Sequence, residues 1–156
     1  MDTARHTEQM NRTVYRRAPG PVPVLGQNLR LVDDEDDAAL ADLMERAYAG
    51  TIDEHLGGNS DGAVEIADWR PDAVPHASFV AEEDGIVAAS LISKNGDDFW
   101  LAYVITHPEW KGRGLGTAVV AASLRALDAP VLAGCTDGNT PSERLLATLG
   151  FTPVPR

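Results

Sequence analysis

The residues of this 156-residue chain best suited to chemistry form one short segment, Lys111-Gly112-Arg113-Gly114-Leu115-Gly116-Thr117. An apolar run from Trp100 to Ile105 precedes it, and a helical pattern follows from about Thr117. Glycine allows backbone conformations closed to other residues and lets the chain approach a ligand closely. Amide groups that converge at a helix N-terminus attract anions, and Lys111 and Arg113 add positive charge. The segment therefore predicts a cradle for a phosphate or pyrophosphate.

Two common phosphate-binding motifs do not fit this segment. A Walker A loop needs a lysine directly after its second glycine, and this chain has none there. The dinucleotide fingerprint Gly-x-Gly-x-x-Gly also fails, because Thr117 occupies the position of the third glycine. The ligand must belong to another class.

The elements around the segment predict a mixed α/β domain. Two tight-turn signals, Asp84-Gly85 and Asn95-Gly96, separate three strand-like runs and so predict an antiparallel meander. A helix then leads to another strand, which should lie parallel to the last strand of the meander. The expected strands are 28–32, 77–82, 86–94, 98–105, 131–136 and 151–154, and the expected helices follow Asp37 and cover 61–69, 117–127 and 140–149.

Composition limits the function classes. The formal net charge is −11, with +3 on residues 1–30 and −14 on the rest, which argues against general nucleic-acid binding. An acidic body could favour a cationic substrate or be a solvated surface. No apolar run is long enough to span a membrane, and no signal peptide is evident. With the single cysteine, Cys135, these features predict a cytoplasmic protein.

Two motifs in the second half of the chain resemble the GNAT (N-acetyltransferase) superfamily. The first is its acyl-CoA motif Gln/Arg-x-x-Gly-x-Gly/Ala, which here reads Lys111-Gly112-Arg113-Gly114-Leu115-Gly116 after an apolar tripeptide and His107-Pro108. The second is Asn-x-x-Ala/Ser-x-x-Leu-Tyr, which here runs from Asn139 to Leu146 and ends in Leu149-Gly150-Phe151. Both occur in order and at the family's spacing, from about Asn28 to Val154.

The resemblance implies the fold, the cofactor and its contacts. The antiparallel meander would lead into a parallel strand pair that splays around acetyl-CoA or another acyl-CoA, with no metal. The function implied is N-acyl transfer, most simply of an acetyl group directly to a primary amine. Strand backbone would pair with pantetheine, the glycine loop would hold the pyrophosphate, and an asparagine would help hold the pantetheine arm. The implied cofactor-binding residues are Val104, Ile105, Thr106, Lys111, Gly112, Arg113, Gly114, Leu115, Gly116, Thr117 and Asn139.

The chain departs from the family pattern at two catalytic positions. Leu146 stands where a tyrosine commonly protonates the leaving thiolate, and Trp100 stands where many members carry a basic glutamate. Asp98, which strict strand alternation places on the face of Trp100, is a candidate base. Other candidates are Asp53, Glu54, His55 and Asp137. These departures leave an alternative open, an acyl-CoA-binding module with little or no transferase activity.

The ends of the chain lead to three further predictions. Residues 1–27 read as an N-terminal extension and residues 28–156 as the acetyltransferase domain. Only five residues follow Phe151, so the sheet would be left with an unfinished edge. Either a homodimer or the N-terminal extension would cover that edge.

Overall fold

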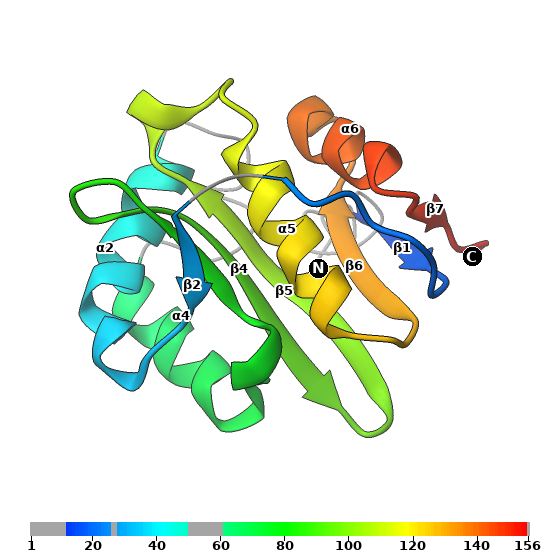
Figure 1. Cartoon of the computed structure of the whole chain (residues 1–156), viewed down its shortest axis with the longest axis horizontal. Coiled ribbons are helices and arrows are strands. Elements are labelled where there is room, and N and C mark those ends of the chain that lie inside the picture. The colour runs from blue at the N-terminus through cyan, green and yellow to red at the C-terminus, as the bar shows by residue number, and fades with distance from the viewer. Residues whose placement is uncertain (1–11, 26–27, 50–60, 156) are drawn as a thin grey trace, which may run out of the picture.

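The computed structural model of the chain describes residues 12–25, 28–49 and 61–155. They form a seven-stranded sheet in the order β2-β3-β4-β5-β6-β1-β7 (Figure 1). The strands are β1 (Arg12–Arg17), β2 (Leu29–Leu31), β3 (Phe79–Glu82), β4 (Ile86–Asn95), β5 (Asp98–Thr106), β6 (Val131–Thr136) and β7 (Thr152–Pro153). The helices are α2 (Asp37–Tyr48), α4 (Gly62–Trp69), α5 (Leu115–Ala126) and α6 (Thr140–Thr148). Four 3-10 turns connect them, η1 (Asp34–Asp36), η2 (Arg70–Asp72), η3 (Pro75–Ala77) and η4 (Pro108–Trp110).

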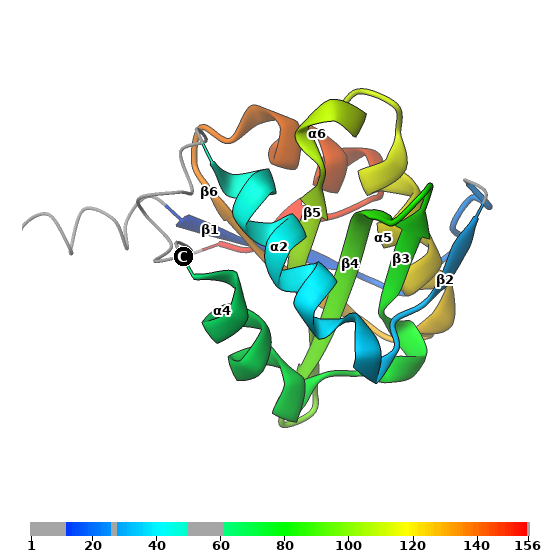
Figure 2. The same ribbon diagram turned by 90° about the vertical axis from the view of Figure 1, so that its left-hand side faces the viewer.

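Helices cover both faces of the sheet (Figures 1 and 2). On one face, α2 and α4 pack on β4 and β5 around Leu40, Met44 and Ile66, all at most 2% exposed. On the other face, α5 packs on β3, β4 and β5, and shares with α6 and β6 a core that contains Val120, Leu146 and other buried residues. The pattern of apolar residues at helical spacing thus produces a three-layer domain.

Strands β3 to β5 form the predicted antiparallel meander, and β2 adds an antiparallel strand beside β3. On the other side, β5 continues into a parallel pair with β6. This pairing covers only Phe99↔Val131, Trp100↔Leu132 and Leu101↔Ala133. Beyond Leu101, β5 remains paired with β4 as far as Thr106, so the two parallel strands diverge. The predicted mixed α/β fold with a splayed parallel pair is confirmed.

A β-bulge in β5 changes which side chains face α2 and α4. Leu91 pairs with Tyr103 but Ile92 pairs with Leu101, so Ala102 is an extra residue. A bulge reverses the alternation of faces along the rest of the strand. Tyr103 therefore packs on the α2 and α4 side, which is also the side of Trp100 and Asp98. Strict alternation along the strand would place Tyr103 on the face opposite Asp98, so an expectation based on that rule is wrong here because of the bulge.

The segment predicted as an N-terminal extension contributes a strand to the sheet. All six residues of β1 pair antiparallel with β6, from Arg12↔Thr136 to Arg17↔Val131. On its other side β1 pairs with β7, and Arg17 Nε donates to the Leu149 carbonyl oxygen at 2.6 Å. The sequence predicted that either a homodimer or the N-terminal extension would cover the sheet edge. In the structure β1, which belongs to that extension, lies beside β6. The division of the chain at residue 27 and the homodimer stay predictions.

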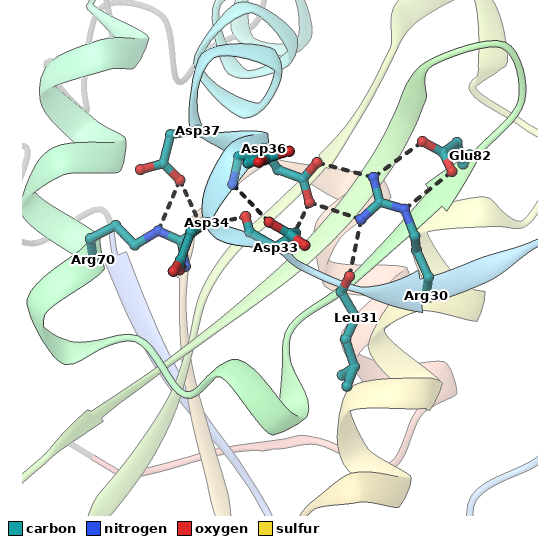
Figure 3. Close-up of polar contacts among 9 residues, drawn as sticks. Arg30, Leu31, Asp33, Asp34, Asp36, Asp37, Arg70 and Glu82 are labelled. Carbon is teal, nitrogen blue, oxygen red and sulfur yellow. Dashed lines mark hydrogen bonds and ion pairs between the residues drawn. The ribbon is translucent and has the colours of Figure 1, made fainter.

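The start of α2 is fixed by two arginines from distant segments (Figure 3). Arg30 binds both Asp36 oxygens, at 2.8 and 3.0 Å, and both Glu82 oxygens, at 3.1 Å. Arg70 donates to Asp37 Oδ1 at 2.8 Å from Nε and to the Asp33 carbonyl oxygen at 2.8 Å from Nη2. Through these contacts the acidic residues of 33–37 tie η1 and the start of α2 to β2, β3 and η2.

Candidate functional site

A cavity of about 1040 Å³ opens where β5 and β6 diverge. Its walls come from the C-terminal half of β5, the end of β6, the glycine loop with the start of α5, and α6. A fifth group of lining residues, Ala47, Tyr48 and Glu65, belongs to α2 and α4. The cavity therefore reaches from the anion-attracting end of α5 to the opposite face of the sheet.

The glycine loop leads into α5 through a left-handed backbone. Gly112 and Gly114 both have a φ of +79°, which L side chains rarely adopt. Gly114 is the N-cap of α5 and carries no side-chain cap, and its carbonyl oxygen accepts from Ala118 N at 3.0 Å. The first amides of a helix have no partner within it, so the amides of Leu115 to Thr117 can meet an anion.

Gly116 lies where α5 approaches β5 and α6 most closely. A Cβ there would be 3.2 Å from Leu145 Cδ1 and 3.4 Å from Thr106 Oγ1. At Gly112 and Gly114 an added Cβ would meet no atom within 4 Å. Close packing therefore explains the glycine at position 116, and the left-handed backbone explains Gly112 and Gly114. All three glycines line the cavity.

Ten of the eleven predicted cofactor-binding residues line this cavity. They are Val104, Ile105, Thr106, Lys111, Gly112, Gly114, Leu115, Gly116, Thr117 and Asn139. The remaining one, Arg113, stacks its guanidinium over the Trp110 ring at 4.4 Å from the ring centroid. The structure brings these residues together, and their contacts with a cofactor stay a prediction.

Helix α6 forms a wall with a polar start and an apolar middle. Its N-cap is Asn139, the residue before the expected helix 140–149, and Asn139 Oδ1 accepts from Ser142 N at 3.4 Å. Leu146, at the position where the family commonly has tyrosine, is only 4% exposed and belongs to the core of α5 and α6. This side chain offers no proton to a ligand.

The wall opposite the glycine loop carries a hydrogen-bonded pair, Tyr103 from β5 and Glu65 from α4. The Tyr103 hydroxyl donates to Glu65 Oε2, and both residues line the cavity. Burial, followed by the hydrogen bond to Glu65, raises the pKa of the Tyr103 phenol well above its usual range. The tyrosine is therefore protonated, and acts as donor, at every physiological pH.

The candidate bases named from the sequence lie elsewhere. Asp98 is exposed at the hairpin end of β5 and does not line the cavity. Because a strand rises about 3.3 Å per residue, Asp98 lies roughly 20 Å along β5 from Val104. Asp137 accepts from the Thr13 hydroxyl at 2.6 Å and does not line the cavity either. Asp53, Glu54 and His55 fall outside the described residues.

Glu65 and Arg12 are among the lining residues that sequence reasoning missed. Glu65 sits within the expected helix 61–69, but nothing local indicates that this helix faces the splayed strands. Arg12 lines the cavity because β1 pairs with β6. Its guanidinium lies over Gly134 of β6, and a Cβ added at Gly134 would be 3.0 Å from Arg12 Nη2. The β-favouring run Thr13-Val14-Tyr15 was the available signal for β1.

Two further features of the described residues bear on function. No group of three or more His, Cys, Asp or Glu side chains in these parts of the chain is arranged to hold a metal ion. Among the helices of residues 12–25, 28–49 and 61–155, none is long and apolar enough to cross a membrane.

Comparison with solved structures shows the same fold in acetyltransferases. A GCN5-related N-acetyltransferase from Sphaerobacter thermophilus matches with a TM-score of 0.66 and 20% identity, over 97% of this chain and 52% of that one. A GNAT-family protein from Novosphingobium aromaticivorans matches with a TM-score of 0.65 and 20% identity, over 92% of this chain and 60% of that one. This chain thus spans between half and two thirds of the length of these two proteins.

A third match is a GNAT acetyltransferase from Brucella melitensis in complex with acetyl-CoA. Its TM-score is 0.51 at 22% identity, over 65% of this chain and 70% of that one. Identities this low show the fold alone. A comparison with curated proteins finds no match.

A family model identifies the chain more directly. The model of the acetyltransferase (GNAT) family matches residues 39–151, which include most of α2, the strands β3 to β5, the glycine loop and α6. The match covers well over half of the chain. The protein therefore belongs to the GNAT acetyltransferase family.

Proposed function

We propose that this protein is an acyl-CoA-dependent N-acyltransferase that moves an acetyl group from acetyl-CoA to a primary amine by direct transfer. One observation carries the proposal. The splayed part of β5, the glycine loop and the start of α5 line the same cavity. Acetyl-CoA would bind there as it does in the family. Cytoplasmic location and a homodimer belong to the same proposal, and the single cysteine, Cys135, supports the first of them.

The residues present suit acetyl-CoA in three places. The amides from Gly112 to Thr117 would hold the pyrophosphate, since they begin a helix and two of the glycines allow the left-handed turn. The edge of β5 at Val104 to Thr106, beyond the last pair with β6, would bind the pantetheine amides as an added strand would. Asn139 would meet the same arm from α6.

When bound, acetyl-CoA supplies an acetyl group activated as a thioester. The chain's own contribution is to hold the amine beside that group and to exclude water, which accounts for a large part of such catalysis. A β5 amide at the splay would stabilise negative charge on the carbonyl oxygen. A thiol with a pKa of about 8.5 leaves acceptably as thiolate, so buried Leu146 does not prevent turnover.

A second candidate, an acyl-CoA-binding module without transferase activity, is favoured by one observation. Leu146 is packed in the core, so α6 presents no tyrosine hydroxyl at that position. A module of this kind would bind the cofactor and release no thiol.

Calorimetry and a thiol-release assay separate the two candidates. The full chain is titrated with CoA and acetyl-CoA, then incubated with acetyl-CoA and putrescine, lysine methyl ester or the dipeptide Ala-Ala. Binding together with amine-dependent thiol release supports the transferase. Binding without release on any amine supports the module, and absence of binding contradicts both.

A further inference from the structure

We propose that Glu65 of α4 is the general base that deprotonates the acceptor amine, and that Tyr103 of β5 is the residue that positions it. The inference rests on the proposed N-acyltransferase function and adds the catalytic group that the sequence did not supply. It places the acceptor's reacting nitrogen at the α4 wall of the cavity, on the side of the sheet away from α5.

The first support is the set of titratable side chains that line the cavity. Among the described residues that line the cavity, Glu65 carries the only carboxylate, and no histidine is among them. The other titratable lining groups are phenols, the Cys135 thiol, and the cations Arg12, Lys111 and Arg144. A carboxylate accepts a proton from an ammonium group more readily at neutral pH than any of these does.

The second support is how Glu65 is held. The residue is half-buried, and its Oε2 accepts the hydrogen bond from the Tyr103 hydroxyl. A carboxylate has acceptor capacity for several donors, and the bond from Tyr103 fixes the orientation of this one. The ammonium of an acceptor can then approach a carboxylate whose orientation is already set.

The third support is the β-bulge at Ala102. Without the extra residue, Tyr103 would point to the α5 side, away from α4. With it, Tyr103 faces Glu65 while the next residue, Val104, faces α5. One short stretch of β5 therefore holds the predicted cofactor edge and the residue that orients the base.

The proton balance is straightforward. The acceptor ammonium gives one proton to the Glu65 carboxylate, and the neutral nitrogen forms its bond to the acyl carbon with its lone pair. The carbon–sulfur bond then breaks, and the sulfur leaves as thiolate with the electron pair. The second nitrogen proton goes to the thiolate through solvent, and Glu65 returns its proton to water.

Several charged or titratable groups surround this base and would shape its pH dependence. Tyr103 faces it from β5, and Tyr48 contributes to the same electrostatic environment from α2. Asp68 lies one turn further along α4, and Glu45 of α2 accepts from Gly62 N at 2.9 Å. Arg12 lines the same cavity from β1.

The test compares Glu65→Gln and Tyr103→Phe with Asp68→Asn. Asp68 is exposed, lies on the same helix and does not line the cavity, so the control removes the same charge without touching the site. Amine-dependent thiol release is followed from pH 5.5 to 9.5 with the best amine of the panel. For Glu65→Gln, kcat/KM should fall about 100-fold with loss of the acid limb of its pH profile, as for a general base. For Tyr103→Phe the fall should be smaller, with the acid limb displaced. Asp68→Asn should keep the wild-type kcat/KM and its acid limb, with at most a small shift of that limb from the lost charge.

Two measurements that do not depend on turnover complete the test. Acetyl-CoA affinity by calorimetry should stay within twofold in all three variants, since the base does not bind the cofactor. Ultraviolet titration of the phenols should show a lower pKa for Tyr103 in Glu65→Gln, with Tyr103→Phe used to assign the signal. If Glu65→Gln fails to fold, Tyr103→Phe and Glu65→Asp decide the outcome through their pH profiles.

The outcomes distinguish the two levels of the proposal. If the wild type turns over and Glu65→Gln is as active as Asp68→Asn, or keeps the wild-type pH profile, the assignment of Glu65 as base is overturned. The proposed transferase activity then still stands. Acetyl-CoA binding with no thiol release on any amine overturns the transferase and the base together.

Discussion

Gly62 offers a sharp test of how α4 is placed. It is the first residue of α4, and a Cβ built on it would lie 2.1 Å from the carbonyl oxygen of Ala41 in α2. Real Cβ contacts are not shorter than 3.0 Å, so Gly62→Ala must separate the two helices by at least 0.9 Å. The obstacle is backbone and cannot rotate away.

The expected cost follows from two opposing effects. Forcing extra volume into a packed contact costs about 1–3 kcal/mol, and an immovable backbone places this case at about 3. Alanine recovers at most about 1 kcal/mol over glycine through its better helix propensity. The net loss is about 2 kcal/mol, which lowers the melting temperature of a domain this size by about 4–8 °C.

Thermal unfolding by circular dichroism and urea denaturation would measure this loss. The control is Gly20→Ala, because a Cβ on Gly20 meets no atom within 4 Å; its change should stay within about 0.5 kcal/mol. The displaced α4 also carries Glu65, so amine-dependent thiol release should fall more than acetyl-CoA affinity does. A Gly62→Ala protein as stable as the wild type would refute the close helix contact and the reasoning built on it.

Three other changes test separate parts of the structure. Gly116→Val puts branched bulk against Leu145 and Thr106 and should weaken acetyl-CoA binding about tenfold, or about 1.4 kcal/mol by calorimetry; unchanged affinity would contradict the site. Arg30 lowers the pKa of the Asp36 carboxyl by hydrogen bonding, so the pair stabilises the fold above about pH 3.9 and loses this effect as pH falls through the lower folded value. Arg30→Ala should therefore unfold at higher pH in an acid titration followed by circular dichroism, and an unshifted midpoint would contradict this. Deleting residues 1–17 should lower the melting temperature and raise the apparent mass in size exclusion, because it uncovers an edge of β6.

The sequence was sufficient where structure is encoded locally. The meander followed from two turn signals, and the glycine loop followed from residues whose backbone freedom is a property of their type. The start of α6 was placed within one residue, because Asn139 and Thr140 are both good caps.

Non-local structure could not be read in the same way. Strict alternation put Tyr103 on the wrong face, since a bulge is set by the pairing with β4 and leaves no local signal. The same rule made Asp98 look like a candidate base, although the cavity lies at the far end of the strand. Glu65 reaches the cavity only through the packing of α4 on α2, which a single sequence does not specify.

The position of β1 has a consequence for how the protein is made. Its partners in β6 lie 114 to 124 residues further along the chain, and its partners in β7 lie further still. The ribosome therefore releases this strand long before the strands that flank it exist. Contacts within the meander and with α2 are local enough to form first, whereas closing such distant segments is slow. Completion of the sheet should be the last step of folding, reached only when the C-terminal strand has left the ribosome.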